Sequence, residues 1–259
     1  MINLVQLRIG IGFIKNQVLN RLSLLLIIFG LTKRVDVSFR NGAGKMEIDS
    51  RECKITLLDH IPPLSFCYPS GRANMLRSLM SLYEIYITEI YEELPVRGRA
   101  VIDVGAGIGD STVYFAKKGA SHIFAFEPLN QEFSVAQKNV KAANVGQLVT
   151  LFHESLGTNS YTNEGSIDTL EIVIERFHIS RASIKIDCEG CEFELFSANS
   201  ADWLKFFDHL ILEYHSKMES LVDVLRDNGF RVTFPQPHIS PGIPEKRRWY
   251  SGLIFAERE

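Results

Sequence analysis

The chain has 259 residues, of which 46% are hydrophobic and 23% charged, and its formal net charge at pH 7 is −3. This length suits one α/β domain with an accessory segment, and the charge provides no field that would gather nucleic acid or another acidic polymer. The four cysteines, at positions 53, 67, 188 and 191, lack the regular spacing of a disulfide-stapled secreted module. This predicts reduced thiols in a cytoplasmic protein.

Residues 22–31 form a strongly apolar run, LSLLLIIFGL, between Arg21 and the pair Lys33 and Arg34. The run is shorter than the about 20 apolar residues of a transmembrane helix, and no small residues of a signal-peptide cleavage site follow it. We expect a helix that packs on the rest of the chain or on a second subunit of a homo-oligomer. The alternatives are a helix in a membrane interface, with peripheral contact through residues 1–31, and a true span.

Residues 35–48 alternate between apolar and polar side chains around an Asn-Gly-Ala-Gly turn, which predicts a β-hairpin. Residues 74–93 carry apolar side chains at helical spacing, which predicts a helix. Pro95 and the basic turn from Arg97 to Arg99 follow this helix. We therefore place a boundary here, with an accessory region over 1–95 and the main domain over 96–259.

From residue 100 onward, short apolar strands alternate with amphipathic segments. Strands are expected at 100–104, 122–126, 148–152, 182–186, 209–213, 230–234 and 253–256, and helices at 111–118, 130–143, 167–177 and 217–228. This alternation predicts an α/β fold with a doubly wound, mostly parallel, Rossmann-like sheet covered on both faces. A proline-rich loop without a helix joins the last two strands, so the final strand is expected to be inserted antiparallel.

The first of these strands runs into a glycine turn, VIDVGAGIGD at 101–110, which opens a helix. Glycines there allow a ligand to approach the backbone closely. A dinucleotide site prefers G-x-G-x-x-G, but here the third glycine, Gly109, comes one residue early and Asp110 follows it. An acid at this helix start disfavours a pyrophosphate and suits an ammonium group, which S-adenosylmethionine carries. The loop therefore favours S-adenosylmethionine over a nicotinamide cofactor.

An acidic residue, Glu127, ends the next strand, about 20 residues after the glycines. A carboxylate at this place can accept hydrogen bonds from both ribose hydroxyls. The alternative is a helix-start acid favoured by the helix dipole. That alternative leaves the match in spacing unexplained.

With these motifs the sequence resembles the FkbM-like family of class I methyltransferases over about residues 80–256. The matching segments, in the family's order, are 101–110, Phe126-Glu127-Pro128 with Asn139 and Asn144, SIDTL at 166–170, IKIDCEGCE at 184–192 and ILEYH at 211–215. The resemblance implies transfer of a methyl group from S-adenosylmethionine to a hydroxyl oxygen of a small-molecule, sugar or lipid-linked acceptor. It does not identify the acceptor.

Polar residues end two further strands of the expected sheet. Asp187 follows residues 182–186, at the topological switch where ligands of open α/β sheets bind, and Glu189 comes in the next turn. His215 and Glu213 end the following strand on one side. His215, with an ordinary pKa near neutrality, is the first choice of general base, and Asp187 is the second. Lys185 is expected either to pair with an acid or to anchor the sheet.

The predicted site combines the glycine turn with the strand ends beside it. The cofactor-binding residues are Asp103, Gly105, Ala106, Gly107, Gly109, Asp110, Glu127, Pro128, Asp187 and Glu189, and the catalytic residues are His215 and Asp187. No metal is expected, because Cys188 and Cys191 have zinc spacing but no second ligand pair. A divalent cation on Asp187, Glu189, Glu213 and His215 is left as an alternative.

The basic, aromatic-containing segment at 238–250 is expected either to cover the acceptor or to form a solvated hairpin. The competing interpretations of the whole chain are an N-methyltransferase acting on RNA or protein, and a cofactor-binding module without turnover. A nucleic-acid substrate is unlikely on this basis, because the sequence contains no Asn/Asp-Pro-Pro-Tyr type motif and no basic surface signal.

Overall fold

The structure is a computed structural model that describes residues 33–38, 44–156, 167–168, 170–188, 190–197, 202–214, 218–234 and 252–258. The expected N-terminal helix at 22–31, the loop at 238–250, Glu189 and His215 lie outside these residues. Within the described part of the chain, no helix is both long and apolar enough to cross a membrane.

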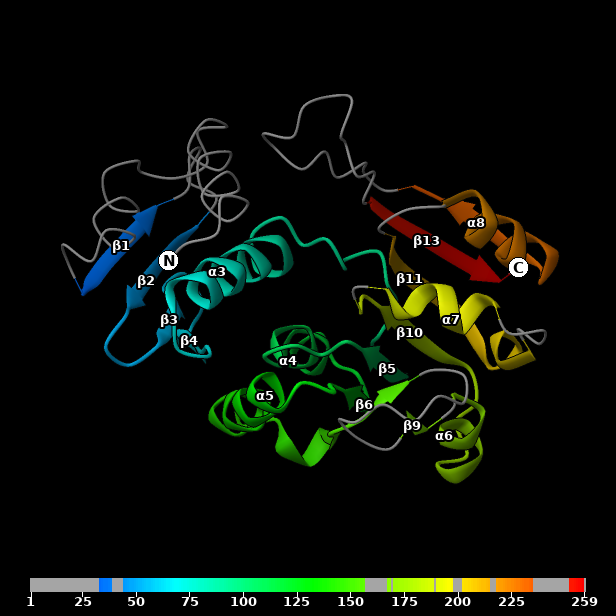
Figure 1. The fold of residues 1–259 in the computed structure, drawn as a ribbon, viewed down its shortest axis with the longest axis horizontal. Helices are drawn as coiled ribbons and strands as arrows, with labels where there is room; N and C mark the ends of the chain where they lie inside the picture. Colours follow the sequence, from blue (N-terminus) through cyan, green and yellow to red (C-terminus); the bar gives the residue numbers. More distant parts are fainter. Residues whose placement is uncertain are drawn as a thin grey trace.

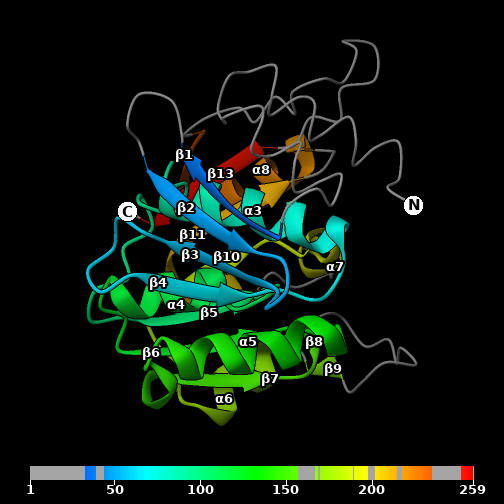
Figure 2. The same ribbon diagram turned by 90° about the vertical axis from the view of Figure 1, so that its left-hand side faces the viewer.

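The accessory region begins with an antiparallel meander rather than a single hairpin. Its four strands are β1 (Arg34–Ser38), β2 (Lys45–Asp49), β3 (Lys54–Leu57) and β4 (Leu64–Cys67), paired in chain order. Figure 2 shows them in front of the helix α3 (Arg72–Tyr86). The hairpin of β1 and β2 is confirmed, with Val37 opposite Met46. The strands β3 and β4 were not predicted, because this part of the chain lacks the alternation of strand and helix that marks the strands of the main domain.

Helix α3 ends earlier than the predicted residue 93. The backbone N–H groups of Ile87 and Thr88 both donate to the carbonyl of Tyr83, at 2.9 and 3.0 Å. Glu89 then adopts a positive φ of 50°, which ends the helical path. The chain continues through turns to the main sheet.

The main sheet has seven strands, in the order β12-β13-β11-β10-β5-β6-β7. Figure 1 labels the strands from β13 to β6. The strands are β5 (Ala100–Val104), β6 (His122–Phe126), β7 (Val149–Phe152), β10 (Ala182–Ile186), β11 (Phe207–Tyr214), β12 (Phe230–Thr233) and β13 (Gly252–Arg258). Strand β13 is antiparallel to both of its neighbours, and the pairs among β11, β10, β5, β6 and β7 are parallel. The predicted antiparallel insertion of the last strand is confirmed.

Helices cover both faces of this sheet, which confirms the doubly wound architecture. Alternate strand residues belong to two hydrophobic clusters, as Val101 and Ile102 illustrate. One cluster includes α4 (Asp110–Lys117), α5 (Asn130–Ala142), α3 and the meander. The other includes α6 (Leu170–Arg176), α7 (Cys191–Ser197) and α8 (Met218–Asp227). The accessory region therefore shares a core with one face of the sheet.

Two further local expectations were wrong. The helix expected from residue 167 starts at Leu170, because residues 167–168 form β9, which pairs in parallel with β8 (Ser155–Leu156). Cys188 and Cys191 are joined by a disulfide rather than being reduced thiols. The turn from β10 into α7 brings their Cα atoms to 5.5 Å, within the range that a disulfide bridges. Cys53 and Cys67 are free.

Candidate functional site

The glycine turn after β5 has three left-handed glycines, with φ of 77° at Gly105, 54° at Gly107 and 79° at Gly109. A Cβ on Gly105 would lie 1.9 Å from the carbonyl oxygen of Asp187, and one on Gly109 would lie 3.2 Å from Ala136. A Cβ on Gly107 would meet nothing nearer than a carboxylate oxygen of Asp110, at 4.0 Å. Gly105 and Gly109 thus permit close packing of the chain, whereas Gly107 faces open space where a ligand could approach.

A buried ionic cluster supports the turn from below. Asp103 is fully buried, and its Oδ2 accepts hydrogen bonds from the hydroxyls of Ser111 at 2.8 Å and Thr112 at 2.7 Å. Its Oδ1 lies 3.2 Å from Nζ of Lys185. Sequence reasoning placed Asp103 among the cofactor-binding residues. Its position beneath the turn lets it fix the start of α4, and its contact with a cofactor stays a prediction.

Lys185 links this cluster to the turn itself. Its Nζ donates to the carbonyls of Val104 at 3.2 Å and Gly105 at 2.6 Å. Burial alone would lower the pKa of Lys185, but the carboxylates of Asp103 and Asp187 outweigh burial and raise it. The ammonium group therefore stays charged. It pairs with an acid, as one of the two predicted alternatives had it, and it also anchors the turn to β10.

Glu127 follows β6, and its carboxylate is held in one orientation. Gly107 N–H donates to Oε2 and Leu129 N–H donates to Oε1, each at 2.8 Å. The residue is 5% exposed. Burial raises its pKa, although the two N–H donors oppose that effect. The structure thus brings Glu127 against Gly107, as the spacing of the motifs predicted.

The two other predicted loop residues lie beside this pair. Ala106 is buried, and the N–H groups of Gly105 and Ala106 both donate to the carbonyl of Phe126, at 3.0 and 2.9 Å. Pro128 is partly exposed, next to Glu127. The turn and the end of β6 are therefore joined through backbone as well as side-chain hydrogen bonds.

Asp187 ends β10 on the other side of the turn. Its N–H donates to the carbonyl of Val104 at 3.1 Å, and its Oδ2 accepts from the hydroxyl of Tyr91 at 3.2 Å. Nζ of Lys185 lies 3.9 Å from the same oxygen, and the side chain is 27% exposed. Asp187 therefore combines a fixed backbone with a carboxylate that solvent or a ligand can reach.

Asp110 opens α4 and faces the accessory helix. Ser81 Oγ donates to its Oδ2 at 2.5 Å, and the hydroxyl of Tyr86 donates to its backbone carbonyl at 3.0 Å. Burial raises the pKa of this carboxyl, and the hydrogen bond from Ser81 opposes that effect. The acid predicted to face a ligand's ammonium group is thus already engaged by α3.

Sequence reasoning missed the residues that the accessory region contributes. Glu84 lies one turn after Ser81 on the same side of α3. Its pKa is raised to about 7 by burial and then by the carboxylates of Asp187 and Asp110. Tyr91, which binds Asp187, comes from the segment after α3. The sequence signal that could have revealed them is the polar pair Ser81 and Glu84, which interrupts the apolar pattern of residues 74–93.

Asn139, on α5, joins the accessory meander to the glycine turn. Its Oδ1 accepts from the N–H of Cys67 at 2.7 Å, and its Nδ2 donates to the carbonyls of Cys67 at 3.0 Å and Ile108 at 2.8 Å. The residue is 1% exposed. One buried amide thus fixes the end of β4 and the turn together.

Two further acids, Glu192 and Glu213, lie near this edge. Glu192 is fully buried and accepts from Gly190 N–H at 2.8 Å within its own turn. Glu213 is partly buried near the end of β11. Among the described residues, no group of three or more His, Cys, Asp or Glu side chains is arranged to hold a metal ion.

Similarity to known proteins concerns the fold. No protein-family model and no curated protein sequence matches the chain. Solved structures do match. TrmK of M. capricolum with S-adenosylhomocysteine is 12% identical, with 66% of this chain and 67% of that chain covered and a TM-score of 0.48. Precorrin-6y C5,15-methyltransferase of Geobacter metallireducens GS-15 is 15% identical, with 73% of this chain and 90% of that chain covered and a TM-score of 0.40. Magnesium protoporphyrin IX methyltransferase of Synechocystis PCC 6803 with bound SAM is 17% identical, with 71% of this chain and 79% of that chain covered and a TM-score of 0.41.

Proposed function

We propose that the chain is an S-adenosylmethionine-dependent methyltransferase that modifies a hydroxyl oxygen on a small-molecule, sugar or lipid-linked acceptor. The observation that carries the proposal is the pairing of Glu127 with Gly107 at the open side of the glycine turn. The resemblance to the FkbM-like family supports oxygen as the atom methylated. In this proposal the protein acts in the cytoplasm, and residues 1–31 are the candidate contact with a membrane or a second subunit.

The residues at the turn fit this cofactor. A carboxylate has about four acceptor positions, and backbone N–H groups use one on each oxygen of Glu127. The remaining positions can accept the two hydroxyls of a ribose. Gly107 leaves room for the ligand beside them, and Asp187 presents a partly exposed carboxylate for an ammonium group. Glu189, outside the described residues, remains a proposed contact.

S-adenosylmethionine supplies an electrophilic methyl group on a positively charged sulfur. The chain's own contribution is to hold the donor and the acceptor in line and to take the acceptor's proton. His215 is the proposed base, with Asp187 as the second candidate. Glu84 joins them, because its pKa of about 7 suits a group that must gain and lose a proton near neutral pH.

The test begins with titration calorimetry on the full chain. We expect binding of S-adenosylmethionine and none of NAD. Glu127→Ala should weaken binding by about 1.5–3 kcal/mol, because charged hydrogen bonds to the ribose are lost. Glu132→Ala removes a nearby carboxylate that pairs with Arg77, at 3.8 Å, and serves as the control. Tight NAD binding without S-adenosylmethionine binding would refute the proposal.

A second measurement identifies the acceptor class. The labelled methyl donor is incubated with the enzyme and with separate fractions of lipid-linked glycans, small hydroxylated molecules, RNA and protein. Label in an alkali-stable ether of the first two fractions is expected. Label only in RNA or protein would replace the O-methyltransferase with an N-methyltransferase, and cofactor binding without label in any fraction would favour a binding module.

A further inference from the structure

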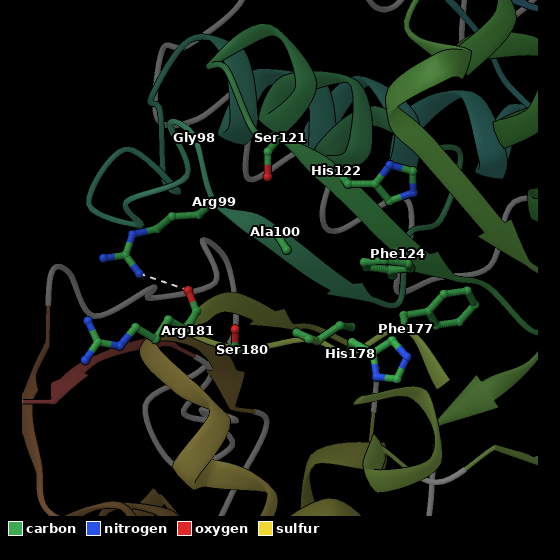
Figure 3. Close-up of a pocket in the computed structure, with 11 residues that line it drawn as sticks. Gly98, Arg99, Ala100, Ser121, His122, Phe124, Phe177, His178, Ser180 and Arg181 are labelled. Atoms are coloured by element: carbon green, nitrogen blue, oxygen red, sulfur yellow. Dashed lines mark hydrogen bonds between the residues drawn. The ribbon is translucent and has the colours of Figure 1, made fainter. Parts of the chain in front are cut away.

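A groove lies at the amino ends of β5, β6 and β10, at the opposite edge of the sheet from the glycine turn (Figure 3). Its volume is about 650 Å³, within the range of small-molecule sites. It is bounded by the turn at residues 98–100, the start of β6 and the loop between α6 and β10. The groove is separate from every residue assigned above to the cofactor.

One end of the groove carries positive charge. The guanidinium groups of Arg99 and Arg181 lie together there. Arg99 donates to Asp208 at 3.0 Å and to the backbone carbonyl of Arg181 at 3.1 Å, so its position is fixed. The Arg181 side chain is exposed and has no acidic partner among the described residues, and none of the residues that line the groove is acidic. This end can therefore attract and bind an anion.

The backbone at Arg181 contributes to this arrangement. Its φ is 51°, a left-handed conformation that a residue with a long side chain rarely adopts. His178 also has a positive φ, of 52°, but it ends α6, where such a conformation is common. Arg181 ends no helix. Its conformation turns the carbonyl toward Arg99 and places both arginines at the same end of the groove, and strained backbone of this kind gathers at functional sites.

The other end is aromatic. The rings of Phe124 and Phe177 lie with centroids 4.7 Å apart, and the rings of His122 and Phe124 are also 4.7 Å apart. Burial lowers the pKa of His122, and its Nε2 lies 2.8 Å from Oγ1 of Thr150. His178 stands at the same end (Figure 3). These rings provide a surface on which a planar aromatic group can stack.

Hydroxyl groups lie between the two ends. Ser121 and Ser180 are both exposed and both line the groove, on opposite sides of it (Figure 3). The order along the groove is therefore aromatic rings, hydroxyls and guanidinium groups. A nucleotide has the matching order of base, sugar and phosphate.

We propose that this groove binds a phosphorylated nucleotide, with the phosphate between Arg99 and Arg181, the sugar beside the two serines and the base against Phe177 and His178. Guanidinium groups are suited to phosphate because their paired N–H donors match its oxygens. The same chemistry is offered by a free nucleotide and by a nucleotide within an RNA strand. The site would be a second one, distinct from the proposed adenosyl pocket.

The test measures binding of AMP and of adenosine to the full chain, with and without saturating S-adenosylhomocysteine. Arg181→Gln should raise the dissociation constant for AMP at least about tenfold, because a charged hydrogen bond to phosphate is lost, and should change adenosine binding little. Phe177→Leu should weaken both ligands. Arg226→Gln removes an exposed arginine on α8 and should change neither.

A single-stranded oligoribonucleotide distinguishes the two sources. Binding that Arg181→Gln weakens and AMP displaces assigns the groove to RNA, whereas AMP binding without oligoribonucleotide binding assigns it to a free nucleotide. Absence of AMP binding, an AMP affinity unchanged by Arg181→Gln, or displacement of AMP by S-adenosylhomocysteine would overturn the proposal. None of these results depends on whether the chain transfers methyl groups.

Discussion

The two edges of the main sheet carry opposite charges and hold them in different ways. At the carboxyl ends, the acids Glu127 and Asp110 are buried, and each is bound by a neighbouring N–H or O–H group. At the amino ends, Arg181 is exposed, and Arg99 is partly exposed in its ion pair with Asp208. Removing one member of a buried ion pair costs much stability, whereas exposed charges contribute little to stability.

The largest expected effect tests the buried side of this contrast. Lys185→Met leaves the fully buried Asp103 without its cation, and we expect a loss of about 3–5 kcal/mol in the free energy of unfolding, measured by denaturant titration. The control is Lys118→Met. It breaks a pair with Glu89 in which both side chains are 41% exposed, and it should cost at most about 1 kcal/mol. Equal losses of stability in the two variants would show that the buried and the exposed ion pair contribute alike.

The next effect concerns the turn itself. Gly105→Ala places a Cβ 1.9 Å from a backbone carbonyl at a φ of 77°, and we expect a loss of about 3 kcal/mol in stability. Gly98→Ala is the matched control, since its φ is 70° and nothing lies within 4 Å of the added Cβ. It should cost only about 1–2 kcal/mol of backbone strain. If the two variants unfold alike, close packing of Gly105 on Asp187 is refuted.

Glu84 gives a pH-dependent test. Its pKa rises from the ordinary 4.5 to about 7 on folding, so the folded state holds this proton more tightly than the unfolded state. The stability contributed by the group therefore falls as pH rises from about 4.5 to about 7. At pH 4.5 the free energy of unfolding of Glu84→Gln should match that of the wild type. At pH 8 it should be higher by on the order of 2 kcal/mol, which is less than the full pKa shift would give, because the side chain is partly exposed.

Thermal unfolding at the two pH values measures this difference. The exposed carboxyl of Glu93 provides the control, because Glu93→Gln should leave the difference between the two pH values unchanged. A Glu84 variant that is less stable than the wild type at pH 8 would show that the charged carboxylate has a stabilising partner in the folded protein.

The smallest effect lies at the amino edge. Arg99→Gln breaks a pair with Asp208 whose side chains are 32% and 28% exposed, and we expect a cost below about 1 kcal/mol that shrinks further at high salt. Denaturant titration at low and high ionic strength measures it. A salt-independent loss of several kcal/mol would mean that this edge holds its charges as the carboxyl edge does.

The sequence located the main sheet well, and the reason is burial. Strands β5, β6 and β10 have the predicted boundaries, because strands buried on both faces read as continuous apolar segments. The antiparallel insertion of the last strand could be predicted, because the sequence between the last two strands is rich in proline and has no helical pattern. By contrast, β3 and β4 belong to a meander without the alternation of strand and helix that marks the equally short β7 and β12. The disulfide between Cys188 and Cys191 depends on a backbone turn that spacing alone does not reveal.

The site was predicted in part, for a related reason. Glu127 and Gly107 could be paired from their motifs, because parallel strands end at a common edge. The roles of Ser81, Glu84 and Tyr91 could not, since they depend on how α3 packs against the turn. The buried position of Asp103 also required the structure. Whether His215 completes the site remains a prediction.

The three hydrogen bonds of Asn139 limit how the molecule can be divided. A fragment that begins at residue 96 would lack the Cys67 backbone, so this buried amide would lose two of its three hydrogen bonds. A different accessory region could replace the meander only if it offered a backbone N–H and a carbonyl to Asn139 at the position of Cys67. A stable fragment of this protein is therefore expected to include the meander as well as the main sheet.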